Sequence, residues 1–250
     1  MEELFKYPLL FAVGSVAGFM NVMAGGGSTI TLPTLIFLGL DGALANGTNR
    51  IALLIQNISG ILSFRQEKYH KFKTSLKLAF FTLPGAIVGS IVATAISDIL
   101  FQKILAYILI GIIISLLLPR PDQNKIANSR QHQKSWLIYP AMVAIGFYGG
   151  FIQAGVGFLF MASLYHLMKL DLVHVNMHKI FIVFIYTIPA LLIFFVTHNV
   201  DFKFGLILAG GNALGAWWAA KFSVKRGDSV IRILLMVAIL MMSLNLLNII

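Results

Sequence analysis

The chain has 250 residues, of which 58% are hydrophobic and only 11% are charged. Soluble domains carry about 25% charged residues, so this composition excludes an ordinary soluble domain and indicates an all-α polytopic membrane protein. The formal net charge is +10, and the absence of cysteine excludes disulfides, thiolate nucleophiles and cysteine metal sites. The cations lie almost entirely between apolar segments, which is typical of membrane topology and not of a nucleic-acid-binding face.

The first predicted element is a helical hairpin within residues 1–41, broken at the sequence GFMNVMAGGGSTITLP of residues 18–33. The break contains three consecutive glycines: Gly25, Gly26 and Gly27. Glycines let the backbone turn sharply, and Ser28 and Thr29 are good N-cap residues for the helix that follows. The free amides and the dipole of that helix start predict an anion site. The alternative is that the glycines serve close packing or a simple loop.

Three apolar spans follow the hairpin and complete a first repeat over residues 1–118. A polar, basic linker at 119–136 precedes a second repeat over 137–250, in which the hairpin is broken at Gly155 and Gly157. The six spans are expected near residues 43–64, 78–96, 100–118, 178–197, 204–221 and 232–250. Each repeat is therefore predicted to be a glycine-broken helical hairpin plus three transmembrane helices.

The two repeats are recognised by a constant offset between them. At an offset of 130 residues, Asp41 falls on Asp171 and Gly85 falls on Gly215. The opening hairpins align at an offset of 132, so the second break falls on the first. A duplicated chain predicts a substrate site at the interface between the repeats.

Matching loops of the two repeats carry opposite amounts of positive charge. The loop at 64–78 has five cations and its counterpart at 194–208 has one. The loop at 95–103 has one cation, whereas its counterpart region carries four: Lys221, Lys225, Arg226 and Arg232. Since Lys and Arg stay on the cytoplasmic side, this alternation predicts two inverted-topology repeats. The protein is expected in the cytoplasmic (inner) membrane, with the linker inside and both termini extracytoplasmic.

The first repeat resembles that of the sulfite exporter TauE/SafE family, and the resemblance extends over nearly the whole chain. It is carried by the duplication, by the basic linker and by these residues: Gly18, Ala24-Gly25-Gly26-Gly27, Pro33 and Ala45-Asn46-Gly47-Thr48-Asn49. The resemblance implies a transporter, expected here to be an exporter, of small anions such as sulfite or an organosulfonate. The second repeat departs from the family pattern at Val156, Phe158, Ser163, His178 and Lys179, which bears on the substrate more than on the fold.

Polar residues at membrane depth are energetically expensive and are therefore candidates for a substrate site. Asn21 and Gln153 precede the two breaks, and their amides either contact an anion or form interhelical hydrogen bonds. Arg50 and Lys179 either contact the anion or snorkel to the membrane interface. The expected substrate-binding residues are Asn21, Gly25, Gly26, Gly27, Ser28, Thr48, Asn49, Arg50, Gln56, Asn57, Gln153, Gly155, Gly157, His178 and Lys179.

Asp171, His174 and His178 leave a second function open, because they share one helix face at a spacing that suits a metal ion. That alternative is a membrane-embedded metal-dependent enzyme. The cluster occurs in one repeat only, so transport is favoured, with no enzyme activity and no cofactor. The expected partners are a small anionic substrate and the lipid bilayer, without nucleic acid; a homo-oligomer is left open. All nine acidic residues are expected at span ends or in loops, which favours anion exit driven by the membrane potential and concentration, with proton-linked movement through histidine as the alternative.

Overall fold

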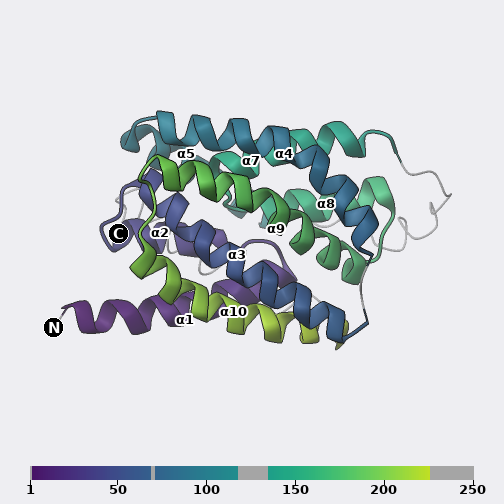
Figure 1. Ribbon diagram of the computed structural model, residues 1–250, viewed down its shortest axis with the longest axis horizontal. Helices are drawn as coiled ribbons and strands as arrows, with labels where there is room; N and C mark the ends of the chain where they lie inside the picture. Colours follow the sequence, from purple (N-terminus) through teal and green to yellow (C-terminus); the bar gives the residue numbers. More distant parts are fainter. Residues whose placement is uncertain (1, 69–70, 118–134, 226–250) are drawn as a thin grey trace.

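The structure is a computed structural model that describes residues 2–68, 71–117 and 135–225 (Figure 1). The described residues form α-helices joined by short connections, with no strand among them. The predicted span at 232–250 and nearly all of the predicted linker lie outside the described residues. The same is true of Arg226 and Arg232.

The helices lie where the apolar segments predict them. The first part of the chain contains α1 (Glu2–Met23), α2 (Ser28–Phe37), α3 (Gly42–Gln66), α4 (Phe72–Ala95) and α5 (Asp98–Leu117). The second part contains α7 (Ile138–Ile152), α8 (Val156–Met168), α9 (Leu172–Val196) and α10 (Phe202–Lys225). The five predicted spans that the structure describes are thus confirmed as helices, and each opening segment is a hairpin of two helices.

The hairpins are not pairs of full membrane spans. Of the four hairpin helices only α1, with 22 residues, reaches the length that the hydrocarbon core of a bilayer requires. The other three legs, α2, α7 and α8, have 10, 15 and 13 residues. At about 1.5 Å per residue these legs are shorter than the roughly 30 Å core. Among the described residues, α4 and α9 have both the length and the hydropathy of a membrane span.

Glycines allow two sets of helices to pack with their backbones in contact. Gly14 and Gly18 of α1 lie against Leu208 and Asn212 of α10, which leaves no room for a side chain. The numbers of the contacting residues increase together along the two helices, so α1 and α10 are parallel. Close approach through small residues is the usual way in which membrane helices associate.

The same kind of packing joins α4 to α7. Gly85 of α4 lies against Val143, and Gly89 lies against Phe147, so this pair is also parallel. In the middle of the molecule, α3 and α9 run in opposite directions, because Gly47 near the start of α3 lies against Phe194 near the end of α9, whereas Gly60 near the end of α3 faces Ile180 near the start of α9. Ser59 and Ser63 of α3 bond to Ala213 and Trp217 of α10, so these helices are parallel, and α4 and α9 begin side by side where Ser75 meets His178. Thus α1, α3 and α10 run one way, while α4, α7 and α9 run the other way (Figure 1).

Packing corrects the sequence alignment of α4 with α10 by one helical turn. Gly85 packs against Val143, and Gly211 packs against Phe11. Val143 and Phe11 match at the offset of 132, so Gly85 takes the structural place of Gly211 and not of Gly215. The wrong match arose because α10 carries glycine at both positions, four residues apart, and either one satisfies the pattern.

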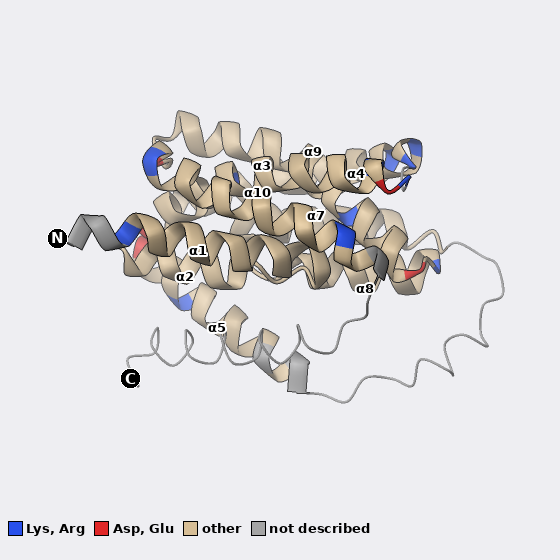
Figure 2. Cartoon of the chain, turned by 90° about the horizontal axis from the view of Figure 1, so that it is seen from below, with Lys and Arg blue, Asp and Glu red and all other residues tan. Residues whose placement is uncertain are grey.

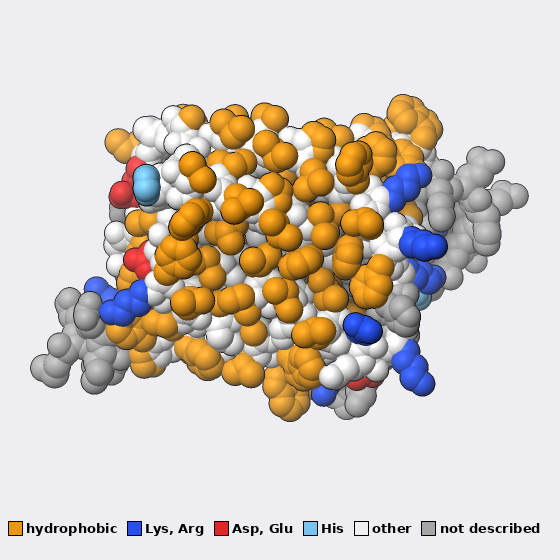
Figure 3. All heavy atoms as spheres, viewed as in Figure 1, with side chains coloured by type: hydrophobic (Ala, Val, Ile, Leu, Met, Phe, Trp, Pro, Cys, Tyr) orange, Lys and Arg blue, Asp and Glu red, His pale blue; other side chains and the backbone are white. Residues whose placement is uncertain are grey.

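Charged residues gather at the ends of the helices, and hydrophobic residues cover the surface between them. Figure 2 shows most of the described Lys, Arg, Asp and Glu at helix ends, and Figure 3 shows a broad hydrophobic face. Five acidic residues of the described part of the chain lie beside a helix end or in the first turn of a helix: Asp41, Glu67, Asp98, Asp171 and Asp201. An apolar band between two charged ends is the surface that a bilayer requires.

Candidate functional site

The two helix breaks touch each other inside the molecule. Gly25 has φ +84 and Gly155 has φ +70, so both occupy the left-handed region that favours glycine. Gly25 lies directly against the backbone of Gly157, where a Cβ on either residue would overlap the other. The segments around both breaks are buried. The structure therefore brings the start of α2 and the start of α8 to one place.

The predicted capping of α2 by Ser28 and Thr29 is wrong. The N-cap residue is Gly27, which has helical φ and ψ, and no side chain caps the helix. The Thr29 hydroxyl donates to the carbonyl oxygen of Gly26 at 2.5 Å, and the Ser28 hydroxyl accepts from the Asn49 amide at 3.3 Å. The described residues offer no hydrogen-bond partner to the backbone N–H groups of Gly27 and Ser28. These two donors are left available at a helix start.

Arg50 of α3 is completely buried, so the alternative that it snorkels to the membrane interface is wrong. Its guanidinium donates to the carbonyl oxygens of Gly149 and Gly150 at the end of α7, and lies 3.4 Å from Gln153 Oε1. The ring of Phe194 lies 4.7 Å from the guanidinium carbon. No carboxylate of the described residues pairs with Arg50, and its Nε has no hydrogen-bond partner.

Lys179 of α9 is also buried, with only 2% of its surface exposed, which again excludes snorkelling. Its Nζ donates to the carbonyl oxygen of Val22 at 2.8 Å and to Asn176 Oδ1 at 2.9 Å. Val22 lies at the end of α1, where the carbonyl groups carry the negative pole of the helix dipole. Each half of the chain thus places a cation on the broken helix of the other half.

The amides beside the breaks form interhelical hydrogen bonds in both halves. Asn21 donates to Gln56 Oε1 at 3.2 Å, and Asn212 donates to the same oxygen at 3.2 Å. In the other half, Gln153 Nε2 lies 3.0 Å from the Tyr186 hydroxyl. Gln56 and Tyr186 match at the offset of 130, so the two pairs occupy corresponding places.

Two deeper residues of the same helices are buried without partners. The Asn57 Nδ2 and the Thr187 hydroxyl make no hydrogen bond within the described residues, and the two positions match at the offset of 130. Buried polar groups of this kind are costly and therefore rare. They suit a site that is completed by a ligand.

Sequence reasoning missed Tyr186, Thr187, Asn212 and Phe194. The repeat offset carried a usable signal for the first two residues, because it maps the predicted site residues Gln56 and Asn57 onto Tyr186 and Thr187.

The residues of the proposed metal site do not come together. Asp171 and His174 form a hydrogen bond near the surface, with Nδ1 and Oδ2 2.5 Å apart, whereas His178 is buried and bonds to Ser75 at 2.7 Å. No group of three potential metal ligands exists among the described residues. Partial burial raises the pKa of Asp171, but hydrogen bonds from His174 outweigh it and lower that pKa below its ordinary value. Asp171 serves as the N-cap of α9.

Thr48 and His178 each make a hydrogen bond to another helix or its connection. The Thr48 hydroxyl accepts from the backbone N–H of Asp201 at 2.9 Å. His178 occupies the matching place in the other half, against Ser75. Asn49 bonds to the Thr31 hydroxyl at 2.7 Å and thereby ties α3 to α2.

The family pattern of sulfite exporter TauE/SafE matches residues 10–246, which is nearly the whole chain. This chain belongs to the sulfite exporter TauE/SafE family. The TauE/SafE protein described here is similar to a "Probable membrane transporter protein ORF9" of Sinorhizobium sp., with 27% identity over 95% of this chain and 91% of the relative.

Two further relatives carry similar names. A "Probable membrane transporter protein" of Haemophilus influenzae is 26% identical over 94% of this chain and 92% of its own length. "Probable membrane transporter protein YfcA" of Escherichia coli is 26% identical over 96% of this chain and 88% of its own length. No solved structure matches this TauE/SafE protein significantly. The family and these relatives identify it as a membrane transporter.

Proposed function

We propose that this protein carries a small anion, such as sulfite or an organosulfonate, out of the cell across the cytoplasmic membrane. The anion is held where the two helix breaks meet. The observation that carries the proposal is the buried guanidinium of Arg50, which has no carboxylate partner among the described residues.

An unpaired buried cation makes the centre of the protein selective for negative charge. Transfer of a charge into a low-dielectric interior costs several kcal/mol unless an opposite charge compensates it. Among the described residues, Arg50 is compensated only by neutral carbonyl oxygens and an aromatic ring. A bound anion supplies the missing charge, whereas a cation is repelled.

Several unused donors add to this preference. They are the Arg50 Nε, the Asn57 Nδ2 and the N–H groups of Gly27 and Ser28. An oxyanion such as sulfite has several oxygen acceptors and can use more than one donor at once. A helix N-terminus is a known environment for such anions.

Inverted repeats suit this proposal because a site between them can open to either side of the membrane. The opposed directions of the set α1, α3 and α10 and the set α4, α7 and α9 support that arrangement. With the linker in the cytoplasm, both chain termini lie outside. Exit of an anion from a negative-inside cell is favoured by about 2.3 kcal/mol per charge per 100 mV, so it needs no proton relay.

The proposal is tested by anion-dependent thermal stabilisation of the purified full-length protein in detergent. The panel is sulfite, sulfate, thiosulfate, sulfoacetate, taurine and short carboxylates. We expect one or more anions to raise the unfolding temperature of the wild type, and Arg50→Gln to abolish that rise. Lys103→Gln is the matched control, because it removes a cation at a helix end and should keep the response.

A liposome flux assay separates transport from binding. Anion efflux should follow a clamped membrane potential in the wild type and should be lost in Arg50→Gln. An anion response that survives equally in Arg50→Gln and Lys103→Gln would place the anion elsewhere. Flux that follows only an imposed pH gradient would contradict uncoupled export.

A further inference from the structure

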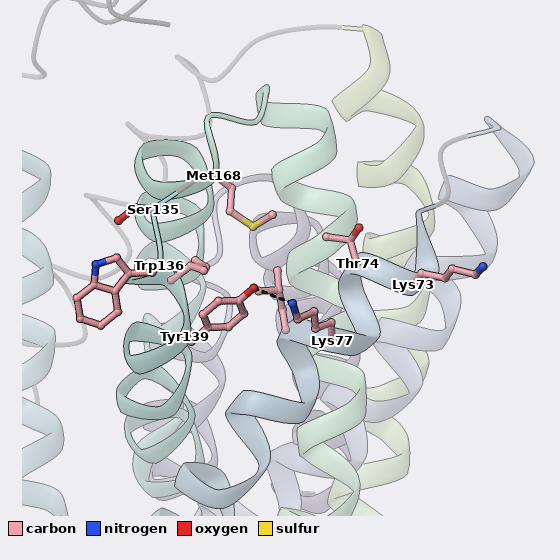
Figure 4. A pocket seen from close by; sticks show the side chains of 9 residues that line it. Lys73, Thr74, Lys77, Ser135, Trp136, Tyr139 and Met168 are labelled. Atoms are coloured by element: carbon pink, nitrogen blue, oxygen red, sulfur yellow. Dashed lines mark hydrogen bonds between the residues drawn. The ribbon is translucent and has the colours of Figure 1, made fainter. Parts of the chain in front are cut away.

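A separate cavity of about 420 Å³ opens at the end of the molecule where α4 begins and α7 starts (Figure 4). It shares no lining residue with the contact between the helix breaks. Its lining residues come from α4, from α7 with the two residues just before it, and from the end of α8: Lys73, Thr74, Lys77, Leu78, Ser135, Trp136, Ile138, Tyr139 and Met168.

The polar part of this cavity is basic. The Lys77 Nζ donates to the Tyr139 hydroxyl at 2.8 Å and lies 4.9 Å from the centre of the Tyr139 ring. Lys73 lines the cavity one turn earlier on α4, with its side chain extended away from the Lys77–Tyr139 pair (Figure 4), and Ser135 adds a hydroxyl. No acidic residue is among the described residues that line the cavity. Its positive charge is therefore available to an anion.

The rest of the cavity is lined by apolar residues of α4, α7 and α8. Leu78, Ile138 and Met168 are buried beneath it. Trp136 is 72% exposed at its rim, and Figure 4 shows that its ring points away from the Lys77–Tyr139 pair. Exposed indoles are typical of the level of lipid headgroups.

We propose that this cavity binds the phosphate group of an anionic phospholipid from the cytoplasmic leaflet. Lys77 and the Ser135 hydroxyl hold the phosphate, and Lys73 at the mouth adds positive charge near it. The apolar floor and Trp136 accommodate the glycerol and the first acyl carbons. Basic pockets between membrane helices on the cytoplasmic side are suited to such headgroups. A soluble phosphate ester shares this chemistry, and the experiment below separates the two sources.

The chain contains its own matched control at the opposite end. Lys203 Nζ lies 4.5 Å from the ring centre of Tyr7, as Lys77 does with Tyr139. Tyr7 and Tyr139 match at the offset of 132, and Lys203 matches Lys77 in the packing register of α4 and α10. Asp201, two residues before Lys203, places a negative charge near this second pair, and the proposed topology puts the pair outside the cell.

The experiment measures phosphatidylglycerol binding to the full-length protein in mixed micelles, by native mass spectrometry and by thermal stabilisation. Phosphatidylcholine is the neutral-lipid probe, and glycerol 3-phosphate is the soluble ester. Two lysines near a membrane surface predict about thirtyfold weaker phosphatidylglycerol binding for Lys73→Gln/Lys77→Gln. Lys203→Gln should bind it as the wild type does.

Each outcome bears on the proposal. Binding of phosphatidylglycerol but not of glycerol 3-phosphate supports the lipid as the occupant. A glycerol 3-phosphate response that the double variant loses shows a phosphate site whose occupant is soluble, and overturns the lipid assignment. Equal binding of the two lipids, or equal losses in the double variant and Lys203→Gln, overturns the site. If the double variant does not fold, Lys77→Gln alone replaces it.

The lipid site and the transport site can fail independently. Arg50→Gln should lose the small-anion response and keep phosphatidylglycerol binding. The double lysine variant should lose phosphatidylglycerol binding and keep small-anion stabilisation.

Discussion

Replacement of Gly25 by alanine perturbs the contact between the two helix breaks most directly. Gly25 has φ +84, where an L side chain costs about 1–2 kcal/mol. A Cβ at this position would also overlap the backbone of Gly157, and overpacking of this kind costs about 1–3 kcal/mol. We therefore expect Gly25→Ala to lower the free energy of unfolding by about 2–5 kcal/mol.

Two other glycines separate these costs. Gly39 has φ +100, but a Cβ there meets nothing within 4 Å, so Gly39→Ala should cost only the conformational part, about 1–2 kcal/mol. Gly111 lies within α5, has open space around it and has no positive φ. Gly111→Ala should therefore be neutral or stabilise by up to about 1 kcal/mol.

The assay heats the purified full-length protein in detergent and measures the fraction that remains monodisperse by size-exclusion chromatography. For a chain of this size, about 1 kcal/mol corresponds to roughly 2–4 °C in the midpoint. We expect the midpoint to fall in the order Gly111→Ala, wild type, Gly39→Ala and Gly25→Ala. A Gly25→Ala midpoint at or above that of Gly39→Ala would refute the close contact between the breaks.

Three polar side chains give further predictions. Asp171→Ala should lower the free energy of unfolding by about 1 kcal/mol through loss of the α9 cap. Because the pKa of Asp171 is lowered, this contribution is present at neutral pH and is lost as the pH falls through that lowered pKa. If the wild type remained more stable than Asp171→Ala below that pKa, the cap would be contradicted. Asn57→Ala should leave thermal stability unchanged or raised but weaken anion-dependent stabilisation about tenfold, as the loss of one hydrogen bond implies; an unchanged anion response would exclude Asn57 from the site. Lys179→Met should lower the free energy of unfolding by about 1–3 kcal/mol, since the carbonyl of Val22 loses its donor; the thermal midpoint measures this, and an unchanged value would show that the contact is not stabilising.

The sequence was sufficient to place the helices, because long apolar runs and glycine breaks are local features. It was not sufficient to align α4 with its counterpart α10 in the second repeat, since Gly211 and Gly215 offer the same small surface one turn apart. The capping of α2 failed for a similar reason. The N-cap rule assumes an extended residue before the helix, whereas Gly27 is helical and the Thr29 hydroxyl bonds backward to Gly26.

The environment of Arg50 also depends on contacts that no local pattern contains. Arg50 is eight residues beyond the start of α3, about 12 Å along the helix axis, which is too deep for its side chain to reach the nearer helix end. Its partners Gly149, Gly150 and Gln153 belong to the other half of the chain. Sequence reasoning could select Arg50 as a candidate, but only the fold shows that its carbonyl partners come from the second break.

The two buried cations connect the halves of the molecule crosswise. Arg50 extends from α3 to the end of α7, and Lys179 extends from α9 to the end of α1. A movement of one half against the other must therefore break or re-form these contacts. An anion bound to Arg50, as proposed, competes with the carbonyls of Gly149 and Gly150 for the same guanidinium. Anion binding is then coupled to the contact between Arg50 and α7. An anion that favours the arrangement without this contact shifts the population toward that arrangement.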